Sequence, residues 1–151
     1  SWSSTAPMSA EFWVTRRRKS PAEDRRDAAF NPHELGLCGE ALAARYLEEK
    51  GFSCEARRLR TKTVEIDLLM RRGRLWVAVE VKTRRRHPAP ERTVNPDLVR
   101  RLRRALILLA PHLRPRPRKL RIDIVAVNLP GRQSAKLRHW PGQEFLPTKA
   151  R

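Results

Sequence analysis

Two neighbouring stretches of alternating apolar and polar residues constrain the fold of this chain more than any other feature of its sequence. Residues 63–70 and residues 75–83 both alternate in this way, and the turn-forming sequence Arg-Arg-Gly-Arg lies between them. Successive side chains of a strand point to opposite faces, so the pattern predicts a β-hairpin. Its apolar face is expected to carry Val64, Ile66, Leu68 and Met70, followed by Leu75, Val77, Val79 and Val81.

An Asn-Pro pair introduces each of two helical segments. Asn is a preferred N-cap residue, and Pro is favoured at the first helical position. Asn31 is therefore expected to cap a helix that runs to about Lys50, and Asn95 to cap a second helix that ends before Pro111.

Three further strands complete the predicted fold: an alternating strand over residues 120–128 and two weaker patterns over residues 52–60 and 136–140. The order α-β-β-β-α-β, with the last strand added, predicts an α/β fold whose mixed central sheet is flanked by helices. The expected domains are a flexible basic N-terminal arm (1–30), a folded domain (31–141) and a C-terminal tail (142–151).

The charge balance indicates an anionic partner. The chain has 34 Lys and Arg residues against 16 Asp and Glu residues, a net charge of +18. Such an excess destabilises a compact chain by self-repulsion unless a polyanion balances it, so a nucleic acid or an acidic surface is expected. The alternative is that the Arg-rich composition reflects codon bias alone.

The sequence lacks the marks of membrane insertion or secretion. No apolar run approaches the roughly 18 residues of a membrane span, and no secretory signal precedes the domain. Two cysteines, Cys38 and Cys54, are too few for a disulfide framework or a zinc site of their own. We therefore expect a cytoplasmic protein with reduced cysteines and no membrane partner.

Carboxylates on the first helix and on the hairpin are the candidate chemical groups. At 100° per residue, Glu40 falls on one helical stripe with Leu37, Ala44 and Leu47. A charged group at a buried position is usually paired or bound to metal. Helix packing on the hairpin would bring Glu40 towards Asp67, Glu80 and Lys82.

This set of side chains has the chemistry of phosphodiester cleavage. Mg²⁺ binds a few carboxylates while keeping water ligands, and it stabilises charge on a phosphate. Lys82 follows Glu80 by two positions, so its ammonium projects from the same strand face and could hold the attacking water or a phosphate oxygen. The alternative is an ordinary solvated ion pair beside exposed acidic residues.

The ordered motifs resemble those of the bacterial YraN family, within the PD-(D/E)xK nuclease superfamily and similar to archaeal Holliday-junction resolvases. The resemblance covers roughly residues 33–128. It implies a restriction-endonuclease-like core. The motifs are Gly39-Glu40, Glu65-Ile66-Asp67-Leu68, Val79-Glu80-Val81-Lys82-Thr83-Arg84 and Arg121-Ile122-Asp123.

The resemblance also implies roles for individual residues. The metal ligands would be Asp67 and Glu80, with the Val81 carbonyl and Glu40 as further ligands, and Lys82 would act like a catalytic base. The metal would be Mg²⁺ or Mn²⁺. Arg121 and Asp123 would support the structure, while Glu65 would belong to the motif or brace the site.

Two positions depart from the family pattern. Val64 stands where the family has Gly before the Glu-Ile-Asp run, which could alter a strand kink. Leu98 stands where the family has a Lys near the start of the second helix, which removes one phosphate contact. The proposed acidic metal site is unaffected by either departure.

Arginines around the candidate site are expected to hold nucleic-acid phosphates, which the acidic residues alone would repel. They are Arg71, Arg72 and Arg74 at the hairpin tip, Arg84, Arg85 and Arg86 after Lys82, and Arg100 and Arg101 on the second helix.

Three functions are compatible with these features. The first is a metal-dependent endonuclease for branched or structured DNA. DNA is favoured over RNA as the substrate, and a homodimer is one possible oligomeric state. The second is a non-catalytic nucleic-acid-binding protein on a nuclease-like scaffold. The third is a basic adaptor that holds an acidic protein. Metal-dependent turnover and steeply salt-dependent binding would separate the three.

Overall fold

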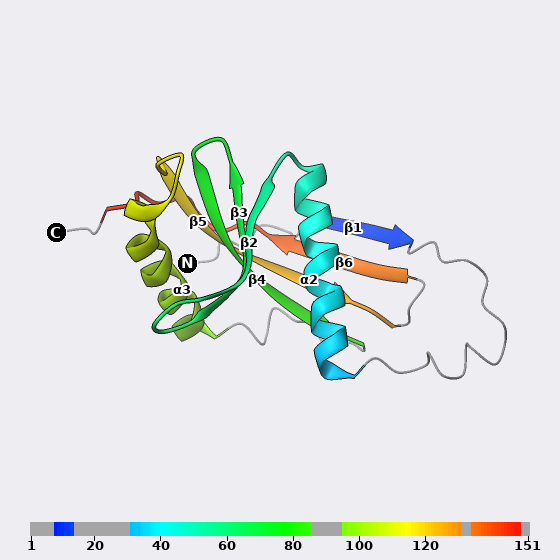
Figure 1. The fold of residues 1–151 in the computed structure, drawn as a ribbon. Coiled ribbons are helices and arrows are strands. Elements are labelled where there is room, and N and C mark those ends of the chain that lie inside the picture. The colour runs from blue at the N-terminus through cyan, green and yellow to red at the C-terminus, as the bar shows by residue number, and fades with distance from the viewer. Residues whose placement is uncertain (1–7, 14–30, 86–94, 131–133, 149–151) are drawn as a thin grey trace, which may run out of the picture.

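A computed structural model describes residues 8–13, 31–85, 95–130 and 134–148. Figure 1 shows a single sheet with its two long helices on opposite sides. The elements are β1 (Met8–Trp13), α2 (Pro32–Glu49), β2 (Ser53–Arg60), β3 (Glu65–Arg72), β4 (Leu75–Arg84), α3 (Pro96–Leu109), the short 3-10 helix η2 (Ala110–His112), β5 (Lys119–Asn128) and β6 (Ser134–Trp140). The predicted α/β class, with a mixed sheet between helices, is confirmed.

The sheet has six strands in the order β1-β6-β5-β4-β3-β2. The β4–β5 pair is parallel, and the other neighbours are antiparallel. Parallel neighbours need a crossover connection, and α3 supplies it between β4 and β5. The start of α3 therefore lies towards the end of the sheet at which β4 finishes (Figure 1).

Strand β1 was not expected. It pairs antiparallel with β6 over its whole length, from Met8 opposite His139 to Trp13 opposite Ser134. The expectation of a flexible arm over residues 1–30 is therefore wrong for Met8–Trp13. The remainder of that arm lies outside the described residues. In the predicted tail, Phe145 forms an isolated bridge with Leu120.

Both faces of the sheet are buried. One core contains the α2 residues and, from the hairpin, Leu68, Met70, Val77 and Val79. The other contains the α3 residues and, from the hairpin, Ile66, Leu69, Trp76 and Ala78. The alternation predicted for β4 is thus confirmed.

The alternation predicted for β3 is wrong at one step. Ile66 belongs to the core under α3, whereas Leu68 and Met70 belong to the core under α2. The strand therefore changes the face that it presents at Asp67. The change lies next to Leu68, the last β3 residue that pairs with β4, and it adjoins the candidate site.

The helix signals are confirmed, with one correction. The Asn31 side chain accepts a hydrogen bond from the Glu34 N–H at 2.8 Å, and the Asn95 side chain caps α3 by accepting from the Asp97 N–H at 2.9 Å. Leu37, however, is 42% exposed and does not join the buried stripe of α2.

Cys38 and Cys54 form no disulfide within the described part of the chain, and both are partly buried. None of the helices in the described part of the chain is long and apolar enough to cross a membrane.

Candidate functional site

The candidate site forms where β3 and β4 separate. Their ladder ends at the pair Leu68–Val79, and the next positions along the two strands are Asp67 and Glu80. Beyond this point β3 pairs with β2, while β4 continues beside β5. The gap between the strands is bridged by a side chain, because the Val81 N–H donates a 2.8 Å hydrogen bond to Asp67 Oδ2.

The Asp67 carboxylate lies in an unfavourable electrostatic environment. Burial and the negative charge of Glu80 raise the pKa of Asp67 from 3.8 to about 7, and the charge of Glu40 and hydrogen bonding to Glu80 add to the rise. The hydrogen bond from Val81 opposes it. Two carboxylates this close favour either a proton or a cation between them.

Helix α2 brings Glu40 to the same region through a close contact at Gly39. A Cβ added at Gly39 would lie 1.9 Å from Thr83 Oγ1 and 2.8 Å from Thr83 Cβ, so only glycine allows this approach to β4. Glu40 is the next residue and is 9% exposed. The sequence prediction that a carboxylate is buried on this helix is confirmed.

Two basic side chains neutralise the buried glutamates. Lys82 Nζ lies 3.1 Å from Glu80 Oε1, as expected for residues two apart on one strand face. Arg58 Nε donates to Glu40 Oε2 at 3.0 Å, and Arg58 Nη2 donates to Glu40 Oε1 at 3.4 Å. The sequence analysis did not identify Arg58, because an arginine in a weak strand pattern gives no indication that it pairs with a residue on a helix.

The donor set fits a hard divalent cation. Mg²⁺ is commonly bound by one or two carboxylates, with waters and substrate phosphates completing its octahedron. Asp67 and Glu80 provide such a pair, and the pKa of Asp67 is raised by its burial and by the negative charges of Glu80 and Glu40. Within the described residues, no group of three or more His, Cys, Asp or Glu side chains is placed to hold a metal.

The geometry supports Glu40 and Val81 as metal ligands less directly than it supports Asp67 and Glu80. The negative charge of Glu40 raises the pKa of Asp67. Within the described residues, however, Glu40 does not form a three-residue acidic cluster with Asp67 and Glu80. Val81 is placed by its N–H group, and its carbonyl as a ligand stays a prediction.

The hairpin-tip arginines lie away from the acidic site. The tip at Gly73 is roughly 20 Å from Asp67 along an extended strand, at the opposite end of the hairpin (Figure 1). Arg71 pairs with Glu55 at 2.8 Å, Arg72 lies over the Phe52 ring and Arg74 Nε donates to the Arg116 carbonyl. The structure thus does not bring these three arginines to the acidic residues.

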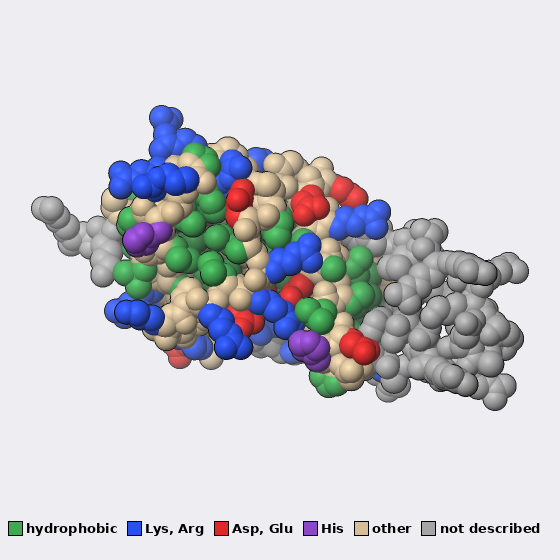
Figure 2. Space-filling view, in the orientation of Figure 1, with side chains coloured by type: hydrophobic (Ala, Val, Ile, Leu, Met, Phe, Trp, Pro, Cys, Tyr) green, Lys and Arg blue, Asp and Glu red, His purple; other side chains and the backbone are tan. Residues whose placement is uncertain are grey.

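The other predicted phosphate-binding residues have different positions. Arg84 is exposed at the end of β4, two residues after Lys82, and Arg85 is partly buried. Arg86 lies outside the described residues. Basic side chains are spread among acidic ones over the face shown in Figure 2.

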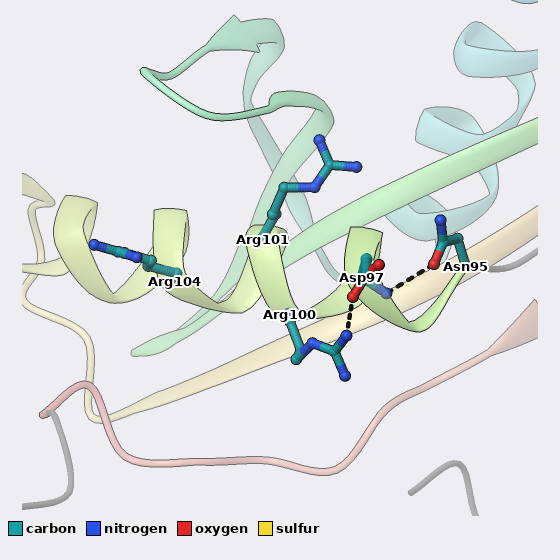
Figure 3. Close-up of a pocket in the computed structure, with 5 residues that line it drawn as sticks. All are labelled: Asn95, Asp97, Arg100, Arg101 and Arg104. Atoms are coloured by element: carbon teal, nitrogen blue, oxygen red, sulfur yellow. Dashed lines mark hydrogen bonds and ion pairs between the residues drawn. The ribbon is translucent and has the colours of Figure 1, made fainter.

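Arg100 and Arg101 border an open hollow of about 460 Å³ at the start of α3, together with Asn95, Asp97 and Arg104. Figure 3 shows Arg100 bonded to Asp97, while Arg101 and Arg104 extend from successive turns of the helix. All three of these arginines are exposed.

A second buried polar group is structural. Asp123 is fully buried and accepts from Arg121 Nε at 2.7 Å and from the Gly142 N–H at 3.1 Å. His139 Nε2 lies 2.7 Å from Asp123, and the Tyr46 hydroxyl lies 3.2 Å from His139 Nδ1. This network joins α2, β5, β6 and the segment after β6. Spacing in the sequence gives no sign of it.

The fold and the site together define an α/β protein with a restriction-endonuclease-like sheet and an acidic site where two of its strands separate. The chain belongs to the uncharacterised protein family UPF0102, also known as YraN, a nuclease-related group of the PD-(D/E)xK type. The family model matches residues 39–127, which include both acidic strands and the buried glutamate of α2.

Relatives come from several bacteria. The UPF0102 protein of Brucella canis is 42% identical over 120 residues, covering 79% of this chain and 86% of that protein. The UPF0102 protein of Syntrophomonas wolfei is 40% identical over 99 residues, covering 62% and 84%. The UPF0102 protein of Leifsonia xyli is 35% identical over 111 residues, covering 72% and 94%.

Proposed function

We propose that this protein is a metal-dependent nuclease that hydrolyses phosphodiester bonds, with branched or structured DNA as the favoured substrate. The observation that carries this proposal is the pair of half-buried Asp67 and buried Glu80 at the point where β3 and β4 separate, with Lys82 beside it. Two carboxylates and an ammonium group at one site suit phosphoryl chemistry, in which charge must be balanced on both nucleophile and phosphate.

Each side chain has a defined task in this proposal. Asp67 and Glu80 would hold Mg²⁺ or Mn²⁺, which supplies charge stabilisation on the phosphate and a lowered pKa for a bound water. The Val81 N–H orients the Asp67 carboxylate through Oδ2. Lys82 is 23% exposed and pairs with Glu80, so its ammonium can hold a water or a phosphate oxygen at the edge of the site.

The exposed arginines support binding of a polyanion. Arg100, Arg101 and Arg104 surround the hollow at the start of α3, and the helix N-terminus adds its own preference for negative charge. These contacts would offset the repulsion between the acidic site and a phosphate backbone.

The test is cleavage of labelled four-way, flapped and duplex DNA, and of matched RNA, with Mg²⁺ or Mn²⁺. Glu80→Gln should reduce cleavage by at least about a hundredfold, because it removes one of two metal-binding carboxylates. Glu55→Gln is the matched control: Glu55 pairs with Arg71 on the same sheet, away from the site, and its variant should cut like the wild type. Equal cutting by Glu80→Gln and wild type would contradict the proposal.

The second candidate is a nucleic-acid-binding protein without catalysis. It is favoured by the ion pairs Arg58–Glu40 and Lys82–Glu80, which balance two of the buried carboxylates with the protein's own cations. This candidate predicts strongly salt-dependent DNA binding without metal-dependent turnover on any of the substrates above.

A further inference from the structure

Arg58 has a backbone conformation that requires an explanation. Its φ of 50° lies in the left-handed region, which disfavours residues with a Cβ atom, and among the described non-glycine residues it is the one with positive φ. Strained residues of this kind persist where the surrounding structure holds them, and they concentrate at functional sites.

The strained residue lies directly across from the acidic site. In the β2–β3 ladder Arg57 pairs with Leu68 and Leu59 pairs with Ile66, so Arg58 takes the position opposite Asp67. The face change of β3 and the left-handed turn of β2 therefore occur at the same level of the sheet. The result is that the Arg58 side chain reaches α2 and meets Glu40.

The Arg58–Glu40 pair differs from an ordinary surface ion pair. The Glu40 side chain is only 12% exposed, and both of its oxygens accept from Arg58. The Arg58 side chain is 36% exposed. Its guanidinium has five N–H donors in a rigid fork, and Glu40 accepts from Nε and from Nη2. One side of the fork is thus fixed by a buried carboxylate, while the group still reaches solvent beside the acidic pair.

We propose that Arg58 binds a phosphate oxygen of the nucleic-acid backbone next to the acidic site, and that Glu40 is the positioning residue that orients its guanidinium. The proposal rests on the proposed function for the identity of the ligand as nucleic acid. It gives Glu40 a task that requires no direct contact with a metal, in agreement with its absence from any three-residue acidic cluster in the described residues.

The first test compares Arg58→Asn with Arg57→Asn in the full chain. Asn tolerates left-handed backbone, and exposed Arg57 is the neighbouring residue on β2, so the two variants lose the same charge. Binding of a labelled four-way DNA junction is measured in Ca²⁺ over a series of salt concentrations. Arg58→Asn should weaken binding about tenfold and reduce the salt slope by about 0.9. Arg57→Asn should change both much less, and equal effects of the two variants would overturn the proposal.

The second test uses the sign of the Glu40→Gln effect. Removing a negative charge near a polyanion should by itself tighten binding. If Glu40 orients Arg58, the variant should instead bind the same junction several-fold more weakly, with a smaller salt slope. Unchanged or tighter binding would overturn the positioning role.

The third measurement separates this proposal from the proposed function. Isothermal titration calorimetry measures Mn²⁺ binding to Arg58→Asn and to the wild type. The variant should bind Mn²⁺ as tightly as the wild type or more tightly, because the positive charge of Arg58 near the carboxylates is removed. Weaker Mn²⁺ binding would overturn the proposal by showing that Arg58 supports the acidic pair itself. A wild type that binds the junction without cutting it would contradict nuclease activity and leave the Arg58 comparison valid.

Discussion

Asp67 combines burial, a backbone hydrogen bond and neighbouring negative charges in one side chain. Its folded-state pKa of about 7 lies above the ordinary value of 3.8, so the folded state holds a proton more tightly than the unfolded state does. The resulting stabilisation is fully present below the ordinary value and is lost as the pH rises through about 7. At higher pH the charged carboxylate opposes folding unless a cation is present.

Asp67→Asn should therefore stabilise the metal-free protein at alkaline pH. We expect a gain of the order of 1–2 kcal/mol at pH about 8 and little gain at pH about 4, because Asn resembles the protonated carboxyl. The measurement is thermal unfolding in a chelator at both pH values. Exposed Asp97 provides the control variant Asp97→Asn, whose effect should not follow this pH trend. An equal effect of Asp67→Asn at the two pH values would contradict the charge argument.

At the scale of elements, the distance between α2 and β4 decides whether Glu40 reaches the site. The contact of Gly39 with Thr83 sets that distance, since a Cβ would overlap three side-chain atoms of the threonine. Gly36, one turn earlier on the same helix, has open space, because its nearest neighbour would be an Arg58 nitrogen at 3.9 Å. Alanine at Gly36 therefore tests the effect of helix propensity alone, whereas alanine at Gly39 also tests the packing of α2 on β4.

Gly39→Ala and Gly36→Ala form a matched pair. Gly36→Ala should stabilise the protein by about 0.5–1 kcal/mol through helix propensity. Gly39→Ala should destabilise it by about 1–3 kcal/mol, because overpacking exceeds that gain, and it should also weaken DNA binding by displacing Glu40. Denaturant unfolding gives both free energies. A stabilising effect of Gly39→Ala would show that α2 is not held at this contact.

At the scale of the whole molecule, the net charge of +18 opposes compactness. This excess remains after every Asp and Glu is counted, so ion pairs within the chain do not reduce it, and Arg100, Arg101 and Arg104 of α3 stand exposed around their hollow. Screening should therefore stabilise the fold.

We expect the midpoint of thermal unfolding to rise by several degrees when NaCl increases from about 0.01 M to about 0.15 M, as the screening length falls from about 30 Å to about 8 Å. An equal ionic strength of sodium sulfate tests whether the effect is general screening. A midpoint that falls with salt would indicate that attractive ion pairs outweigh the repulsion.

The sequence could predict most of the architecture because local signals agree with the final fold. The Asn-Pro pairs mark the starts of both helices. Alternate residues of β4 belong to the two opposite cores, as the period-two pattern predicts, although both faces of the strand are buried. Strand β1 was missed because its six residues become a strand only by pairing with β6, a contact distant in the sequence.

The candidate site was predictable in part, for similar reasons. A carboxylate on an apolar helix stripe identified Glu40, and the alternation located Glu80 and Lys82 on one face. The left-handed backbone of Arg58 and the face change at Asp67 lie opposite each other in the β2–β3 ladder. Neither feature can be predicted from a period-two pattern, because that pattern assumes regular strands.

The buried Asp123 network has a consequence for where the autonomous folding unit ends. The family match stops at residue 127, yet the partners that satisfy this carboxylate include His139 and the backbone of Gly142. A Cβ at Gly142 would lie 2.1 Å from the Ile122 carbonyl oxygen, so the segment after β6 is fitted closely against β5. A truncation after the matched region would leave Asp123 with Arg121 but without His139 and the Gly142 N–H, and expression boundaries for this protein should therefore extend beyond the glycine.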